Sequence, residues 1–160
     1  MYNIFIYLFF LFIFFLGGGV LPSFAKVYER SSLSPCAWSL IQVHSSELGS
    51  LTLAIVYKAP KCTEQIFKDA MNDLKGNLDS NISYVVVGDF NITDKEKDNQ
   101  KWIDFLKEQF QSSQLVKDYT TCNDTTIDFV FSNLTNENIT VRIIDSVISD
   151  HKLVTIECKS

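Results

Sequence analysis

The stretch VVVGDFNITD, from Val85 to Asp94, decides how the rest of this 160-residue chain is interpreted. Three successive valines are typical of a strand that is covered on both faces of a sheet. Asp89 and Asn91 follow the valines directly after Gly88. Either these two side chains close a turn, or a rigid strand end holds them in place for chemistry.

Apolar patterns on both sides of this stretch predict one domain, in which strands and helices alternate before a run of strands. Five strands are predicted from β-branched, aromatic or alternating apolar side chains, at 50–57, 82–90, 125–133, 138–146 and 151–159. A first helix is predicted at 63–78, with Thr63 as its N-cap. A second helix ends near Gln111, and Thr93 and Glu96 form a capping box at its start. This order of elements predicts an α/β or α+β fold.

The first 25 residues carry no charged side chain and include an unbroken apolar run at 4–16. The run is shorter than the roughly 20 residues that span a bilayer. One interpretation is a signal peptide cleaved before Lys26, or an anchor that contacts the membrane through residues 4–21. The others are a buried strand of an incomplete domain and a start in unrelated sequence. We therefore treat residues 1–25 as an N-terminal segment and residues 26–160 as the domain.

The net charge of −5 argues against one class of nucleic-acid-binding protein. A protein that holds nucleic acid by bulk electrostatics needs clusters of Lys and Arg to neutralise phosphates. An enzyme that meets a phosphate through a divalent cation is not excluded, because such a site requires carboxylates. The net charge therefore does not decide whether the partner is a nucleic acid.

The four cysteines are widely spaced, and no CxxC pair occurs, which excludes a zinc ribbon. They permit two disulfides in a secreted protein, or buried thiols in a reducing compartment. Five Asn-x-Ser/Thr sites are present, at Asn81, Asn91, Asn123, Asn133 and Asn138. Composition alone produces such sites in an Asn-rich chain, so they do not establish secretion.

Further polar groups interrupt apolar sequence in the C-terminal half. Asp128 lies within IDFVF, where a carboxylate is costly to bury unless it is paired or hydrogen-bonded. Asp150 and His151 directly precede the last predicted strand. A histidine suits proton transfer near neutral pH, and a buried carboxylate can fix its tautomer and support its charged form. A carboxylate beside the histidine could hold Mg²⁺, which prefers oxygen ligands.

Three sequence blocks in a fixed order carry a resemblance to a known family. The blocks GDFN (88–91), IDFVF (127–131) and SDHKLV (149–154) resemble the last three motifs of the endonuclease/exonuclease/phosphatase superfamily, and LAIVYKAP (53–60) resembles its preceding strand. The spacings and the lead-in at 17–35 resemble retroelement and Helitron-type endonuclease domains more than secreted DNases. The resemblance implies a partial DNase I-like β-sandwich with helices on its outer faces.

By this resemblance, the reaction is hydrolysis of a phosphodiester bond in DNA with Mg²⁺, or alternatively Mn²⁺, as the cofactor. Asp89 would orient or activate the attacking water, whereas Asn91 and Tyr57 would contact the phosphate. These roles place all three residues at one substrate site.

The resemblance also assigns the C-terminal polar residues. Asp128 would orient His151, which would lie beside the scissile phosphate as a base or as an electrostatic stabiliser. Asp150 would bind or position the metal. No protein partner is indicated by the sequence.

The first part of the sequence departs from the family pattern. The family has a metal-binding Glu in a QE-like motif there, whereas residues 1–25 contain no acid, and Glu29 and Glu47 lie in no such motif. We therefore expect a truncated domain of transposable-element origin with weak activity or none, located in the nucleus or cytoplasm. The alternatives are a non-catalytic remnant or binding domain, and a secreted or membrane-tethered DNase I-like hydrolase directed there by residues 1–25.

Overall fold

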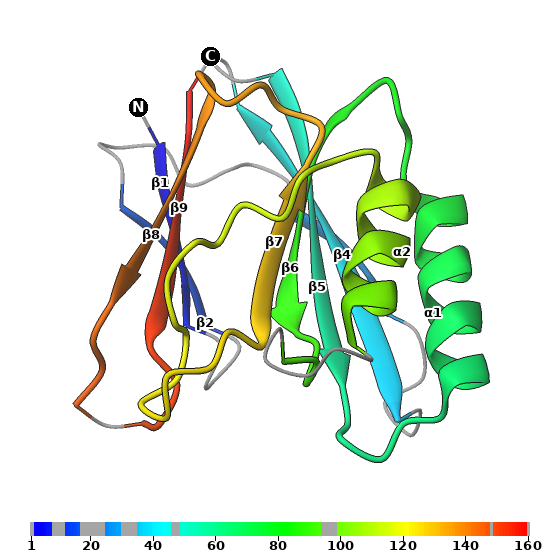
Figure 1. Ribbon diagram of the computed structural model, residues 1–160. Helices are drawn as coiled ribbons and strands as arrows, with labels where there is room; N and C mark the ends of the chain where they lie inside the picture. The colour runs from blue at the N-terminus through cyan, green and yellow to red at the C-terminus, as the bar shows by residue number, and fades with distance from the viewer. Residues whose placement is uncertain are drawn as a thin grey trace.

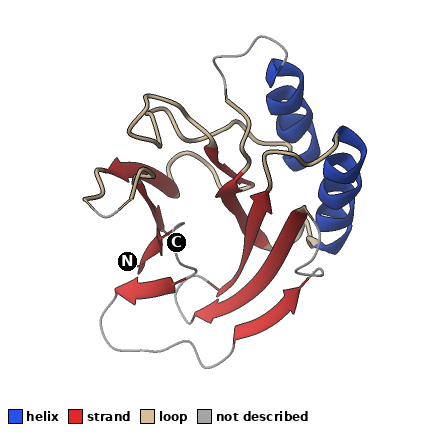
Figure 2. Ribbon diagram, turned by 90° about the horizontal axis from the view of Figure 1, so that it is seen from below, coloured by secondary structure: helices blue, strands red, loops and turns tan. Residues whose placement is uncertain are grey.

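Two β-sheets face each other, and two helices cover the outer face of the larger sheet (Figures 1 and 2). The computed structural model describes residues 2–7, 12–16, 25–29, 35–45, 49–93, 99–147 and 149–159. This arrangement confirms the predicted mixed α/β class and the predicted β-sandwich. Both described helices lie on the same side of the sandwich, on the outer face of the larger sheet.

The larger sheet contains the VVVGD strand. Its strands, in spatial order, are β3 (Ala25–Glu29), β4 (Cys36–Ser45), β5 (Gly49–Lys58), β6 (Ser83–Asp89) and β7 (Asp128–Ser132). The β5–β6 pair is parallel, and the other neighbours are antiparallel. A parallel pair needs a long crossover connection, and the first helix supplies it.

The smaller sheet joins the two ends of the described chain. Its strands, in spatial order, are β2 (Phe12–Leu16), β1 (Tyr2–Tyr7), β9 (Leu153–Cys158) and β8 (Ile139–Ile144), and all its pairs are antiparallel. Two parts of the apolar segment 1–25 are therefore strands of this sheet. The signal-peptide interpretation stays a prediction, and most of the lead-in at 17–35 lies outside the described residues.

The helices are α1 (Glu64–Asn77) and α2 (Gln100–Phe110). Thr63 is the N-cap of α1, as predicted, and its Oγ1 accepts a hydrogen bond from the backbone N–H of Ile66 at 3.4 Å. Within the part of the chain that the structure describes, no helix has the length and apolar composition needed to cross a membrane.

The predicted capping box at the start of the second helix is not tested, because residues 94–98 lie outside the described part of the chain. α2 begins at Gln100, and the side chain of Asn99 donates a hydrogen bond to the carbonyl of Thr93 instead of capping the helix. The buried face of α2 begins only at Trp102. Glu96, the other half of the predicted capping box, lies outside the described residues.

Two separate cores explain why β6 is apolar on consecutive positions. Tyr84 and Val86 pack toward the helices, whereas Val85 and Val87 pack between the two sheets. Side chains alternate between the faces of a strand, so a strand with two covered faces needs apolar residues throughout. The three valines therefore mark a strand that is covered on both faces, as predicted.

Candidate active site

Three neighbouring strands of the larger sheet place polar side chains in one row at the edge where β6 ends and β7 begins. Tyr57 is in register with Asp89 across the β5–β6 pair, and Asp89 is in register with Asp128 across the β6–β7 pair. Paired residues project from the same face of a sheet. Asp89 shares the alternation of Val85 and Val87, so the row points toward the smaller sheet.

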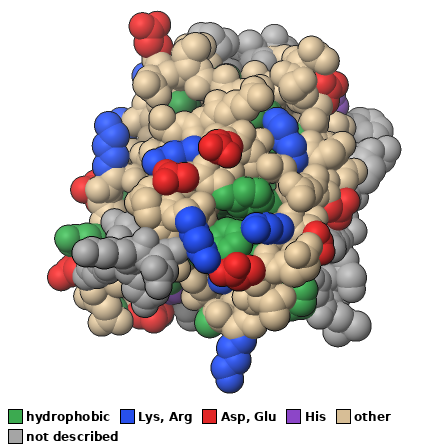
Figure 3. Space-filling model, turned by 45° about the vertical axis from the view of Figure 1, so that its right-hand side comes forward, with side chains coloured by type: hydrophobic (Ala, Val, Ile, Leu, Met, Phe, Trp, Pro, Cys, Tyr) green, Lys and Arg blue, Asp and Glu red, His purple; other side chains and the backbone are tan. Residues whose placement is uncertain are grey.

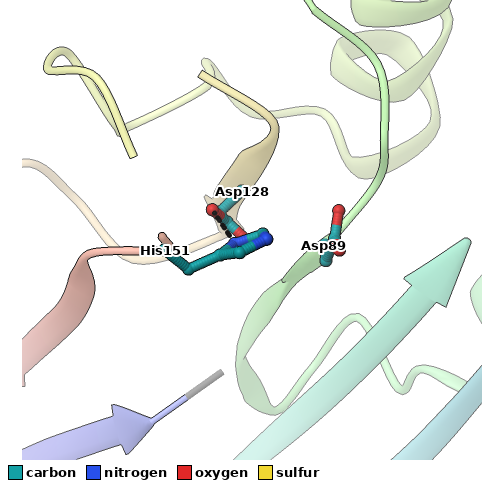
Figure 4. Close-up of side chains that lie close together, drawn as sticks. All are labelled: Asp89, Asp128 and His151. Carbon is teal, nitrogen blue, oxygen red and sulfur yellow. Dashed lines mark hydrogen bonds and ion pairs between the residues drawn. The ribbon is translucent and has the colours of Figure 1, made fainter. Parts of the chain in front are cut away.

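His151 approaches this row from the smaller sheet, two residues before β9 begins (Figure 4). Its Nδ1 atom lies 3.1 Å from Oδ2 of Asp128. The Asp128 side chain is 0% exposed and the His151 side chain is 20% exposed. Because a buried carboxylate is costly without a partner, this hydrogen bond accounts for an acid inside an apolar strand.

A polar segment that the sequence analysis did not single out holds this pair. The Oγ1 atom of Thr120 accepts a hydrogen bond from the backbone N–H of Asp128 at 3.2 Å, and its carbonyl accepts one from the N–H of Lys152 at 2.7 Å. Cys122 donates its N–H to the carbonyl of Asp150 at 2.8 Å. The fully buried Thr120 therefore links the strand of the acid to the segment of the histidine.

The carboxylates around His151 favour its charged form. The hydrogen bond to Asp128 raises the pKa of His151 to about 9, and the charges of Asp128, Asp89 and Asp150 act in the same direction. Burial opposes this shift and only partly offsets it. The imidazole is therefore protonated at neutral pH.

Asp89 has the opposite environment for a carboxylate. Burial raises the pKa of Asp89 to about 6, and the charge of Asp128 adds to the increase. The backbone N–H of Asn91 and the charge of His151 act against it. Asp89 therefore gains and loses its proton close to neutral pH, whereas His151 keeps its own.

Asn91 closes a turn at the end of β6. It has a left-handed backbone, with φ of 47°, and its N–H donates to Oδ1 of Asp89 at 2.9 Å. Its side-chain Nδ2 donates to the carbonyl of Lys58 at 2.8 Å. Asp89 therefore takes part in a turn with Asn91 and also belongs to the site, so the two interpretations are compatible. Contact of Asn91 with a phosphate stays a prediction.

One group of side chains has the geometry to hold a cation. Asp89, Asp128 and His151 each offer a ligand atom, and these atoms all lie within 4.8 Å of one another. Oδ1 of Asp128 is buried and has no hydrogen-bond partner among the described residues. Two carboxylates suit Mg²⁺ or Mn²⁺, because these hard cations prefer oxygen ligands to the ring nitrogen of His151. The donor set that fits a hard cation is therefore Asp89 and Asp128.

The other two predicted site residues lie outside this group. Asp150 is exposed, and the structure connects it to His151 through charge. Tyr57 is 51% exposed at the end of β5, beside Asp89 in the sheet. The structure therefore brings together the acids of β6 and β7 with the histidine, places Tyr57 at the border of the site, and leaves Asp150 at the surface.

Comparison with solved structures identifies the architecture. An endonuclease/exonuclease/phosphatase family protein from Leptotrichia buccalis C-1013-b matches with a TM-score of 0.60 and 12% identity, over 88% of this chain and 62% of that one. An endonuclease/exonuclease/phosphatase from Beutenbergia cavernae DSM 12333 matches with a TM-score of 0.57 and 16% identity, over 86% of this chain and 45% of that one. No protein-family model matches the sequence, and no curated protein matches it.

These matches show that the chain has the DNase I-like fold of endonuclease/exonuclease/phosphatase proteins, which the three sequence blocks predicted. The chain spans less than two thirds of the length of either solved structure.

Proposed function

We propose that this domain is a divalent-metal-dependent phosphodiesterase that acts weakly on DNA at the group formed by Asp89, Asp128 and His151. The observation that carries this proposal is the buried Asp128–His151 hydrogen bond, with Asp89 within 4.8 Å of both partners. Three segments that are distant in the sequence meet there at the border of the two sheets. The DNase I-like fold supports the reaction class by analogy.

The two shifted pKa values assign different roles to the acid and the imidazole. Near pH 7, Asp89 is mostly ionised and accepts a hydrogen bond from the attacking water, because the pKa of this carboxyl is about 6. His151 carries its proton, because its pKa is about 9, and its positive charge stabilises the negative charge that develops on the phosphoryl group. Enzymes commonly combine an acid and a base in one site by separating their pKa values in this way, as with Asp89 and His151.

Asp89 and Asp128 are the residues that would hold the cation. When bound, Mg²⁺ or Mn²⁺ would supply further stabilisation of charge on the phosphoryl and leaving oxygens. Two carboxylates with one shared cationic neighbour hold such an ion weakly, and this supports low activity. The role of Asp150 as a metal ligand remains a prediction from the sequence.

The surface charge indicates a low affinity for nucleic acid. On the face shown in Figure 3, Lys and Arg side chains are interspersed with Asp and Glu and do not form one continuous patch. The formal net charge of −5 also disfavours binding by bulk attraction. We therefore expect cleavage to depend strongly on the metal. Origin from a retroelement or Helitron-type endonuclease is part of this proposal and rests on the sequence blocks alone.

The purified chain is expected to nick supercoiled plasmid slowly with Mg²⁺ or Mn²⁺, and His151→Ala is expected to lower the rate at least about 100-fold. The loss follows from removal of the only cation that belongs to the group. The matched control is His44→Ala, because His44 is exposed on β4 and bonds only to the nearby Ser50 among the contacts described. Conversion of supercoiled to open-circular plasmid over time measures both variants.

Two results would contradict this assignment in different ways. Equal nicking by His151→Ala and the parent chain would show that another group, or a contaminant, does the chemistry. No nicking by a folded parent chain, with DNA bound, would favour the non-catalytic binding domain instead.

Asp89→Asn is expected to weaken Mn²⁺ binding at least about tenfold, whereas Asp150→Asn should change it by less than about threefold. Asp89 belongs to the three-residue group, and Asp150 lies exposed outside it. Isothermal titration calorimetry measures the affinity, and paramagnetic broadening of the His151 ring signals locates the ion. A stronger effect of Asp150→Asn would support the ligand assignment made from the sequence.

A further inference from the structure

Cys36 and Cys62 lie side by side although 25 residues separate them in the sequence. Cys36 begins β4 and is in register with Lys58 at the end of β5. The chain then turns back, since Ala59 donates its N–H to the carbonyl of Pro35 at 2.7 Å, and Cys62 donates its N–H to the carbonyl of Ala59 at 3.0 Å. These contacts bring the two thiol groups into hydrogen-bonding contact.

The two thiols differ in their access to solvent. Cys36 is 0% exposed, within the core between the larger sheet and the helices. Cys62 is partly exposed on the turn before α1, where it packs against that core. Its Sγ also lies 3.5 Å from the carbonyl of Thr63. A reagent in solution therefore reacts first with Cys62, and Cys36 is the buried thiol that can react with the modified Cys62 afterwards.

We propose that Cys36 and Cys62 form a reversible disulfide that ties the start of β4 to the turn before α1. The proposal concerns a redox site on the helix side of the larger sheet and does not depend on the phosphodiesterase activity. The oxidant is a small-molecule disulfide such as oxidised glutathione.

The exchange proceeds in two balanced steps. The Cys62 thiolate attacks one sulfur of the glutathione disulfide, forms a mixed disulfide and releases one glutathione thiolate. The Cys36 thiolate then attacks the Cys62 sulfur and releases the second glutathione thiolate. Both protein protons pass to the released thiolates, so two protein thiols are oxidised and one glutathione disulfide is reduced.

The surroundings of Cys62 set the pH dependence of the first step. Burial raises the pKa of the Cys62 thiol, and the positive charge of Lys58 only partly opposes this increase. The reactive thiolate is therefore scarce at neutral pH. Below the thiol pKa, the rate of disulfide formation is expected to rise close to tenfold for each pH unit.

The test incubates the reduced full-length chain with oxidised glutathione at pH 7 and pH 8.5, followed by alkylation with N-ethylmaleimide and peptide mass spectrometry. The expected product is a linked pair of peptides that contain Cys36 and Cys62, formed faster at pH 8.5 and lost after addition of dithiothreitol. Cys62→Ser should abolish the link, whereas Cys122→Ser should retain it, because Cys122 is an exposed thiol on a separate loop.

Either of two results would overturn the proposal. One is a Cys62 that carries glutathione under native conditions but never exchanges it for a bond to Cys36. The other is a link that appears only after the chain has been unfolded in urea, which would show that the folded chain holds the two sulfurs too far apart. Circular dichroism of the Cys62→Ser variant confirms that it is folded.

Discussion

Gly88→Ala is expected to destabilise the protein by at least about 3 kcal/mol, or to prevent its folding. A Cβ atom at Gly88 would lie 1.9 Å from the carbonyl oxygen of Val56 and 2.7 Å from its carbonyl carbon. These are backbone atoms of β5, which is in register with β6 at this position. Relief of the clash would require the two central strands to separate and would break hydrogen bonds between them.

Gly88 also affects the candidate site, because it lies next to two of its residues. Gly88 directly precedes Asp89, and Val56 directly precedes Tyr57. The absent side chain therefore allows the close approach of the two strand ends that carry the site. Gly88 is required here for space.

Gly76→Ala is the matched control for this substitution. Gly76 lies in α1, and a Cβ atom there would meet nothing within 4 Å. Alanine is favoured over glycine inside a helix by about 1 kcal/mol, so this variant should be slightly more stable. Urea unfolding followed by circular dichroism measures both. A Gly88→Ala variant as stable as the parent would contradict the packing of β5 against β6.

Asp128→Asn is expected to lower the pKa of His151 by about 1 to 3 units from its value of about 9. The hydrogen bond that His151 donates to Asp128 is the largest cause of the raised pKa, and the substitution keeps the size of the Asp128 side chain while it removes the charge. NMR chemical shifts of the imidazole ring as a function of pH measure the change directly. His44 provides an internal reference in the same spectrum, since the chain has two histidines.

The same substitution should change how stability depends on pH. The pKa of His151 is raised from 6.5 to about 9 on folding, so the protonated ring stabilises the folded state fully below about pH 6.5. This contribution is lost as pH rises through 9 and amounts to at most about 3.5 kcal/mol, since one pKa unit corresponds to roughly 1.4 kcal/mol. In Asp128→Asn most of this decrease in stability between pH 6.5 and 9 should disappear.

Asp150→Asn provides the comparison for the role of Asp128. The charge of Asp150 is the smallest of the contributions that raise the pKa of His151, so this variant should lower it far less. An unchanged His151 pKa in Asp128→Asn would mean that the pair is not formed in solution, and the candidate site would then lose its central contact.

The sequence predicted most elements after residue 50, because their patterns are local. The strand at 82–90 and the helix at 63–78 agree with β6 and α1 to within one residue at each end. The Thr63 cap agrees as well, since capping depends on residues three apart. β4 was missed, although Cys36, Trp38 and Leu40 are buried alternately along it.

The site could be predicted in part for a related reason. Asp128 was conspicuous because an acid among apolar strand residues requires a partner. The partner, His151, was named only through the family resemblance, because the pairing depends on how the segment before β9 packs against β7, which is a long-range property. The role of Thr120 could not be predicted for the same reason. It supports the Asp128–His151 pair through contacts with two segments that are far apart in the sequence.

The pairing of β1 with β9 places the first and last described strands side by side. During translation, β1 is synthesised long before β9 and can pair only with β2 until β9 has been made. Contacts of such long sequence separation slow folding and leave apolar strands exposed in the meantime. We therefore expect the larger sheet to form during translation before the smaller one is complete, and the histidine to join its acid only after the segment that leads into β9 has been synthesised.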